Sequence, residues 1–303
     1  MSRLAGGLVT ALAAAVVLTG CGAGGGGDRP LVVVTTNILG DVVGELVGDQ
    51  AEVLTLMPAG ADPHSFEVSA REAAQMREAD LLVANGLGLE EGVLAQVEAA
   101  REDGVVVVEA GDAVQTVEWT TEDDTGVDPH FWTDPAQVRA VVDSVSAAVA
   151  EHVDGIDGDR LATDTVAYRT ELEDLDAWMV EQLGQVPEPR RNLVTNHHVF
   201  GYLADRFGFT VVGAVIPSGS TLASPSARDL DELAGAIRDA GVSTLFADSS
   251  QSDRLVQVLA EQAGLDVAVV PLFTESLTPP GGGAETYLQM MRANTEDIVE
   301  GLR

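Results

Sequence analysis

The stretch that decides the fold is 159–183, DRLATDTVAYRTELEDLDAWMVEQL. It contains neither glycine nor proline, the two residues that most disfavour a helix interior. Its large apolar side chains recur at intervals of three, four or seven residues and therefore fall on one helical face, namely Leu161, Tyr168, Leu172, Leu175, Met179 and Leu183. At about 1.5 Å per residue the stretch makes a rod of about 37 Å. We predict one long rigid linking helix over residues 159–186, ended by Pro187 and Pro189.

Short β-branched runs alternate with helical stretches on both sides of this rod. In the first half the predicted strands are 31–35, 52–57, 80–84 and 105–109, and the predicted helices 40–47, 69–78, 91–101 and 134–152. In the second half the strands are 192–195, 210–215, 243–247 and 267–270, and the helices 199–207, 227–240, 252–263 and 284–302. Such alternation is typical of parallel sheets covered by helices. The predicted fold class is therefore α/β, with two similar lobes (30–158 and 187–303), each a mostly parallel sheet flanked by helices, joined by one long helix.

The N-terminus predicts export and a lipid anchor. Residues 1–20 carry Arg3 and then an apolar run over 4–18, which has the layout of a signal peptide and is shorter than the about 20 residues of a membrane span. The run ends Leu18-Thr19-Gly20-Cys21, which resembles a bacterial lipobox cut before a lipidated cysteine. The glycine-rich residues 21–29 then form a flexible tether. We expect an extracytoplasmic protein anchored to the cell membrane through Cys21.

Charge and cysteine content narrow the function further. The 303 residues include 16 basic and 49 acidic ones, a formal net charge of −33. This balance excludes the basic patches that bind nucleic acid, and it disfavours adhesion to anionic lipid. It is compatible with attraction of cations and equally with a salt-adapted host. Because the chain has one cysteine, any metal site must consist of histidine and carboxylate.

Five histidines provide the candidate ligands: His64, His130, His152, His197 and His198. The tripeptide Asp-Pro-His occurs twice, at 62–64 and 128–130, and the pair at 197–198 follows a predicted strand. Ligands of open α/β sheets bind beyond the carboxyl ends of strands, so three such ends present an imidazole to one region. Adjacent residues of extended chain point in opposite directions, and only one of the pair is expected to face it. His152 ends a helix, where a cation suits the helix dipole.

Several longer motifs carry a family resemblance. They are 35–41, the block Gly60 to Glu67, the block Ala79 to Glu90, Asp128 to Pro135, 195–209 and 286–294. In this order they resemble the cluster A-I metal-binding solute proteins of bacterial ABC importers for zinc and manganese, over essentially the whole mature chain. The resemblance implies two α/β lobes bridged by a rigid helix, no enzymatic activity, and a permease and its ATPase as partners. A metal-delivering chaperone is a further candidate partner, and a monomer is expected.

The resemblance also implies the ligands. His64 and His130 match the two ligands of the N-terminal lobe, and His197 matches the third, which is histidine in zinc importers and typically glutamate in manganese ones. The fourth ligand in many members is an aspartate in a loop before the final helix, where this chain has Glu275. Asp248, at the end of a strand, is the alternative fourth ligand, or else a residue that supports the ligands. His198 is expected outside the ligand set.

Three imidazoles and one carboxylate favour Zn(II) as the transported ion. Zinc accepts such a set tetrahedrally, whereas manganese prefers oxygen-rich ligands. Binding needs deprotonated ligands, so capture should weaken as the pH falls through the histidine range. The alternatives are a manganese or iron(II) carrier of the same family, an adhesin-like surface lipoprotein, and a zinc hydrolase with water as fourth ligand, although the chain has no His-Glu-x-x-His motif.

The segment 118–127 departs from the family pattern. Many zinc members carry a long histidine-rich insertion here, whereas this chain reads EWTTEDDTGV. We expect a solvated acidic loop; the alternative is a lure for cations or a docking patch for a metal-delivering partner.

Overall fold

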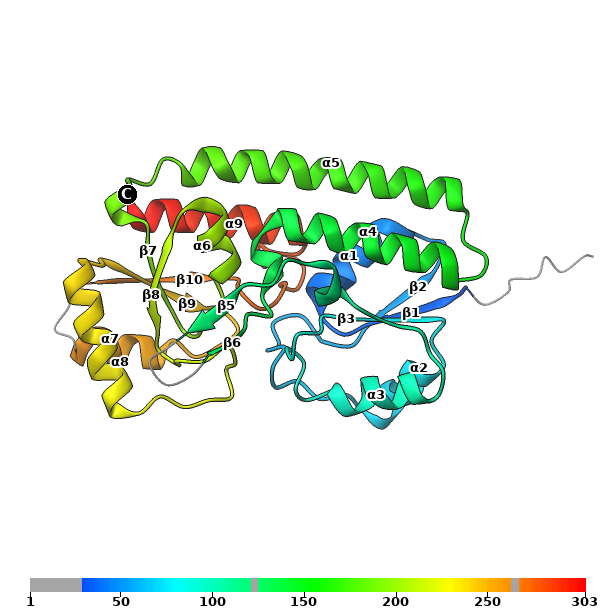
Figure 1. The fold of residues 1–303 in the computed structure, drawn as a ribbon, viewed down its shortest axis with the longest axis horizontal. Coiled ribbons are helices and arrows are strands. Elements are labelled where there is room, and N and C mark those ends of the chain that lie inside the picture. Colours follow the sequence, from blue (N-terminus) through cyan, green and yellow to red (C-terminus); the bar gives the residue numbers. More distant parts are fainter. Residues whose placement is uncertain (1–28, 121–124, 263–266) are drawn as a thin grey trace, which may run out of the picture.

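The computed structural model describes residues 29–120, 125–262 and 267–303, which form two α/β lobes bridged by α5 (Gly158–Leu183) (Figure 1). The helix begins where the Asp157 side chain accepts hydrogen bonds from the backbone N–H groups of Asp159 and Arg160. Its predicted apolar face is buried and packs against α4 (Pro135–His152), α9 (Tyr287–Leu302) and α1 (Asn37–Val47). The predicted rod is confirmed as far as Leu183.

The N-terminal lobe contains four parallel strands in the order β2–β1–β3–β4. They are β1 (Leu31–Val34), β2 (Glu52–Thr55), β3 (Leu81–Ala84) and β4 (Val107–Glu109). Alternate side chains enter different cores: Val32 packs with α1 and α4, and Val33 packs with α2 (Ala70–Arg77) and α3 (Leu94–Glu102). Burial on both faces explains why these strands read as continuous apolar runs.

The C-terminal lobe pairs β7 (Asn192–Thr195) with β8 (Thr210–Ala214) and β9 (Thr244–Asp248) with β10 (Ala268–Leu272), both in parallel. Strand β7 lies beside β9. The helices are α6 (Gly201–Phe207), α7 (Ala227–Ala240), α8 (Arg254–Gln262) and α9. One apolar core runs from α1 and α4 through α5 to α6 and α9, so both lobes share it on the α5 side. The predicted fold class is confirmed.

Some predicted segments differ from the structure. The expected loop at 118–127 is wrong in its described part, because β5 (Glu118–Thr120) and β6 (Thr125–Val127) form an antiparallel hairpin. Helix α1 begins earlier than predicted because the Thr36 side chain accepts a hydrogen bond from the backbone N–H of Leu39. The signal peptide, Cys21 and most of the tether lie outside the described residues. Within the described ranges, no helix is both long and apolar enough to cross a membrane.

Candidate metal centre

The two Asp-Pro-His copies adopt the same local turn. Asp62 Oδ1 accepts a hydrogen bond from the backbone N–H of His64 at 2.9 Å, and Asp128 Oδ1 accepts one from that of His130, also at 2.9 Å. An aspartate that bonds the backbone two residues onward is a common turn-forming device. The first turn follows β2 and the second follows β6, so the repeated motif places two imidazoles by one mechanism.

The structure brings the side chains of His64, His130, His197 and Glu275 together where the two lobes meet. The Nε2 atom of His130 lies 3.3 Å from that of His64 and 3.3 Å from that of His197. Glu275 Oε1 lies 3.0 Å from His197 Nε2 and 3.3 Å from His130 Nε2, and Oε2 lies 3.9 Å from His64 Nε2. Tetrahedral zinc with bonds of about 2.0 Å separates its ligand atoms by about 3.3 Å. The four groups therefore have the spacing of one such coordination shell.

Burial leaves several polar atoms of this group without a protein partner. All four residues are at most 1% exposed. Both carboxylate oxygens of Glu275 and the Nδ1 atoms of His64 and His197 have no hydrogen bond among the described residues. Buried polar atoms are nearly always paired, so the unpaired Glu275 carboxylate, which faces the three imidazole Nε2 atoms, indicates room for a cation.

His130 is the one imidazole of the three with a carboxylate on its far side. Its Nδ1 lies 2.6 Å from Asp128 Oδ1, and both side chains are fully buried. A carboxylate in this place fixes the tautomer, leaves Nε2 free for a metal, and makes the imidazole a stronger donor. This role of Asp128 is not among the roles expected from the sequence, although its signal is present in the second Asp-Pro-His.

Burial shifts the pKa values of the four clustered side chains. It lowers the pKa of His64 to about 4 and that of His130 to about 3, and it lowers the pKa of His197 as well. Burial raises the pKa of Glu275 to about 7. At neutral pH the imidazoles are therefore neutral and can donate their lone pairs, and the group that exchanges a proton near pH 7 is Glu275. The expectation that capture weakens as the pH falls through the histidine range therefore stays a prediction, with Glu275 rather than an imidazole as the first ligand to take up a proton.

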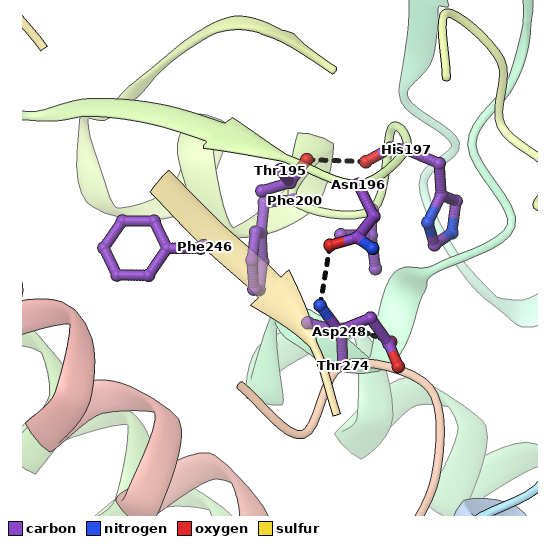
Figure 2. Close-up of a pocket in the computed structure, with 8 residues that line it drawn as sticks. Thr195, Asn196, His197, Phe200, Phe246, Asp248 and Thr274 are labelled. Carbon is purple, nitrogen blue, oxygen red and sulfur yellow. Dashed lines mark hydrogen bonds between the residues drawn. The ribbon is translucent and has the colours of Figure 1, made fainter. Parts of the chain in front are cut away.

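Asp248 lies near the four residues but its carboxylate is already occupied. Thr274 Oγ1 donates to Oδ2, and the backbone N–H and hydroxyl of Ser250 donate to Oδ1. The backbone N–H of Asp248 donates to Asn196 Oδ1 at 2.7 Å (Figure 2). Asp248 thus stabilises the loop that carries His197 through its hydrogen bond with Asn196. Glu275 is the carboxylate that lies beside the three imidazoles.

The remaining two histidines lie elsewhere. His152 is exposed at the end of α4. His198 is half-buried, and its ring stacks on Trp119 of the β5–β6 hairpin, with ring centroids 5.7 Å apart and planes 13° from parallel. The structure therefore turns His197 toward the group and His198 toward the hairpin.

Comparison with known proteins identifies the family. The family model described as zinc-uptake complex component A, periplasmic, matches residues 32–301. The chain belongs to this family. As a member of the zinc-uptake component A family, it is a metal-binding, substrate-binding component of an ABC metal importer and not an enzyme.

Relatives within the family are named for different metals. The manganese-binding lipoprotein MntA of Halalkalibacterium halodurans is 27% identical over 293 residues, covering 95% of each chain. The zinc-binding protein TroA of Treponema pallidum is 28% identical over 278 residues, covering 90% of this chain and 89% of TroA. The solved structure of TroA superposes with a TM-score of 0.83 over 90% of this chain and 99% of its own. Family membership therefore gives a divalent metal as the ligand and leaves its identity to the chemistry of the site.

Proposed function

We propose that the protein captures Zn(II) between its lobes and delivers it to the permease and ATPase of an ABC importer. His64, His130, His197 and Glu275 are the proposed ligands. The observation that carries the proposal is the spacing of three imidazole nitrogens and one carboxylate oxygen, 3.0–3.3 Å along four of the edges. Zinc takes such a shell tetrahedrally without further ligands. Ligands buried this deeply suit carriage of an ion better than surface adhesion.

Manganese and iron(II) are the alternative cargoes, and the name of MntA favours manganese. Manganese prefers harder shells rich in oxygen, and this site offers one carboxylate against three imidazoles. The discriminating residue is His197, because glutamate there would give two imidazoles and two carboxylates. The proposed selectivity thus depends on one side chain.

Competitive chelator titrations of the wild type with Zn(II) and Mn(II) test this proposal. His197→Glu should lower the preference for zinc over manganese, and His152→Ala, at an exposed helix end, is the matched control that should leave both affinities unchanged. Both metals must be compared, since an added carboxylate attracts any divalent ion. A wild type that prefers manganese, or a His197→Glu variant with unchanged preference, would contradict the zinc assignment.

We also propose that the mature protein begins at a lipidated Cys21 and works outside the cytoplasmic membrane as a monomer. The support is the Leu-Thr-Gly-Cys sequence at 18–21, together with relatives that are named lipoproteins. Mass spectrometry of membrane-extracted protein should find a diacylglyceryl-modified Cys21 at the N-terminus. An unmodified N-terminus, or cleavage at another residue, would refute the anchor.

A further inference from the structure

Figure 1 shows α5 along one edge of both lobes and the β5–β6 hairpin between the lobes, away from that edge. Beside this hairpin, hydrogen bonds between side chains join the two lobes. Three consecutive residues after β8 each meet a different N-terminal segment. A Cβ on Gly219 would lie 2.4 Å from Trp119 Nε1, the Ser220 hydroxyl donates to Glu91 at 2.8 Å, and the Thr221 hydroxyl donates to Asp62 Oδ2 at 2.7 Å. We name residues 218–221 the latch.

The latch is bonded to the turns that carry two of the proposed ligands. On its own lobe, the backbone N–H of His198, next to His197, donates to the carbonyl of Ser218 at 2.9 Å. Across the interface, Asp62 Oδ1 accepts from the backbone N–H of His64, while Oδ2 accepts from Thr221 and, at 3.0 Å, from the side-chain amide of Gln251. One carboxylate therefore holds the His64 turn and the opposite lobe at the same time.

Trp119 packs against one edge of this contact. Its ring lies against Gly126 on the partner strand of the hairpin, against Gly219 of the latch, and on the face of His198. Neither glycine could carry a side chain without moving the indole, because a Cβ would approach it to 2.8 Å or less. The hairpin thus contacts the C-terminal lobe through Trp119, while the other side chains of its described residues are exposed.

The two sides of the interface differ in strength. On the α5 side the lobes share a continuous apolar core that includes Trp132 and Tyr287, with the Tyr287 hydroxyl donating to the carbonyl of Trp132. On the latch side the contacts are hydrogen bonds between partly exposed side chains, together with the packing of the Trp119 ring on His198 and Gly219. Ligands that are at most 1% exposed cannot release an ion until some part of the interface opens, and the latch is the side with less buried apolar surface.

We infer that Asp62, bonded to Thr221 and Gln251, holds the lobes closed over the captured ion and sets the rate at which it leaves. This inference rests on the proposed function. Asp62 is a positioning residue: it is not one of the four proposed ligands, and it acts through the His64 turn and the latch. Opening at the latch would separate His64 from His197 while the α5 side stays packed.

Stopped-flow release of zinc from the loaded protein into excess chelator tests the inference. Thr221→Val with Gln251→Ala removes the two hydrogen bonds that the C-terminal lobe donates to the Asp62 carboxylate, and leaves those from the His64 backbone and the Ser65 hydroxyl in place. The double variant should release zinc about tenfold to a hundredfold faster, with the association rate changed much less. Thr221→Ser keeps the hydroxyl and should release zinc at close to the wild-type rate. Ser224→Ala, exposed further along the same loop, is the matched control.

A double-mutant cycle adds a readout that general destabilisation would not reproduce. Asp62→Asn keeps an oxygen for the His64 backbone but removes the charge that binds the latch, so its effect should not add to that of the Thr221–Gln251 pair. Additive effects, or a release rate within twofold of wild type for the pair, would overturn the inference.

Hydrogen exchange of the metal-free protein tests the role of the latch independently of the proposed function. The Thr221–Gln251 pair of substitutions should raise exchange in segments 59–66 and 195–200, whatever metal the protein prefers. A wild type that fails to retain zinc would count against the proposed function alone, and unchanged exchange in both segments would count against the latch.

Discussion

Replacing Asp128 by asparagine tests how the protein strengthens one ligand. The Asp128 carboxylate lies 2.6 Å from His130 Nδ1, and both side chains are fully buried, so the charge acts on the imidazole without solvent between them. Asparagine keeps an oxygen near Nδ1 but loses the charge. Loss of such an outer partner typically weakens metal binding about 10–100-fold. Since His64 and His197 have no comparable partner at Nδ1 among the described residues, we expect a loss of about 100-fold, which is about 2.7 kcal/mol at about 1.36 kcal/mol per tenfold change.

The assay is a competitive titration of zinc against a chelator at pH 7.5, with metal-free wild type and variant compared at equal ionic strength. Asp134→Asn is the matched control, because Asp134 is a buried carboxylate of the same segment that caps α4 and contacts none of the three imidazoles. It should change zinc affinity less than about twofold. Equal losses in the two variants, or an Asp128→Asn affinity within threefold of wild type, would refute the reasoning.

Three further predictions follow from the same geometry. Because burial raises the pKa of Glu275 to about 7, a proton competes with zinc for its carboxylate, and the zinc affinity should fall about tenfold per pH unit below about pH 7 in titrations that extend from pH 8 to below pH 4. The fall should steepen near pH 4, where His64 also protonates. A flat profile down to about pH 5.5 would contradict this. Glu275→Ala should weaken zinc binding more than Asp248→Ala in the same chelator titration, and the reverse order would reassign the fourth ligand. Leu175→Ala, fully buried on α5, should lower the free energy of unfolding by about 2–5 kcal/mol in urea, whereas Val180→Ala, 48% exposed on the same helix, should change it by less than about 0.5 kcal/mol.

The features that could be predicted from sequence are those encoded over a few residues. The apolar face of α5 follows from spacing alone, and the strands of the N-terminal lobe follow from apolar runs buried on both faces. The positions of His64 and His130 could be predicted because each Asp-Pro-His contains its own turn.

Other features depend on contacts between distant parts of the chain. The alternation of side chains along an extended chain predicts that His197 and His198 point in opposite directions. Which of the two faces the other proposed ligands is seen only in the structure, where His198 stacks on Trp119. The bond between Asp62 and Thr221 joins residues 159 positions apart, and no local pattern signals it. The hairpin has strands of three residues, too short for a period to be recognised, and packing against the opposite lobe accompanies its pairing.

The measurement that tests the central claim most directly is a crystal structure of the zinc-loaded protein, with anomalous data on both sides of the zinc edge. The account predicts one peak, bonded at about 2.0–2.2 Å to Nε2 of His64, His130 and His197 and to a carboxylate oxygen of Glu275, with no water in the shell. A peak that omits any of the three imidazoles, or a shell completed by water or by Asp248 in place of Glu275, would contradict it.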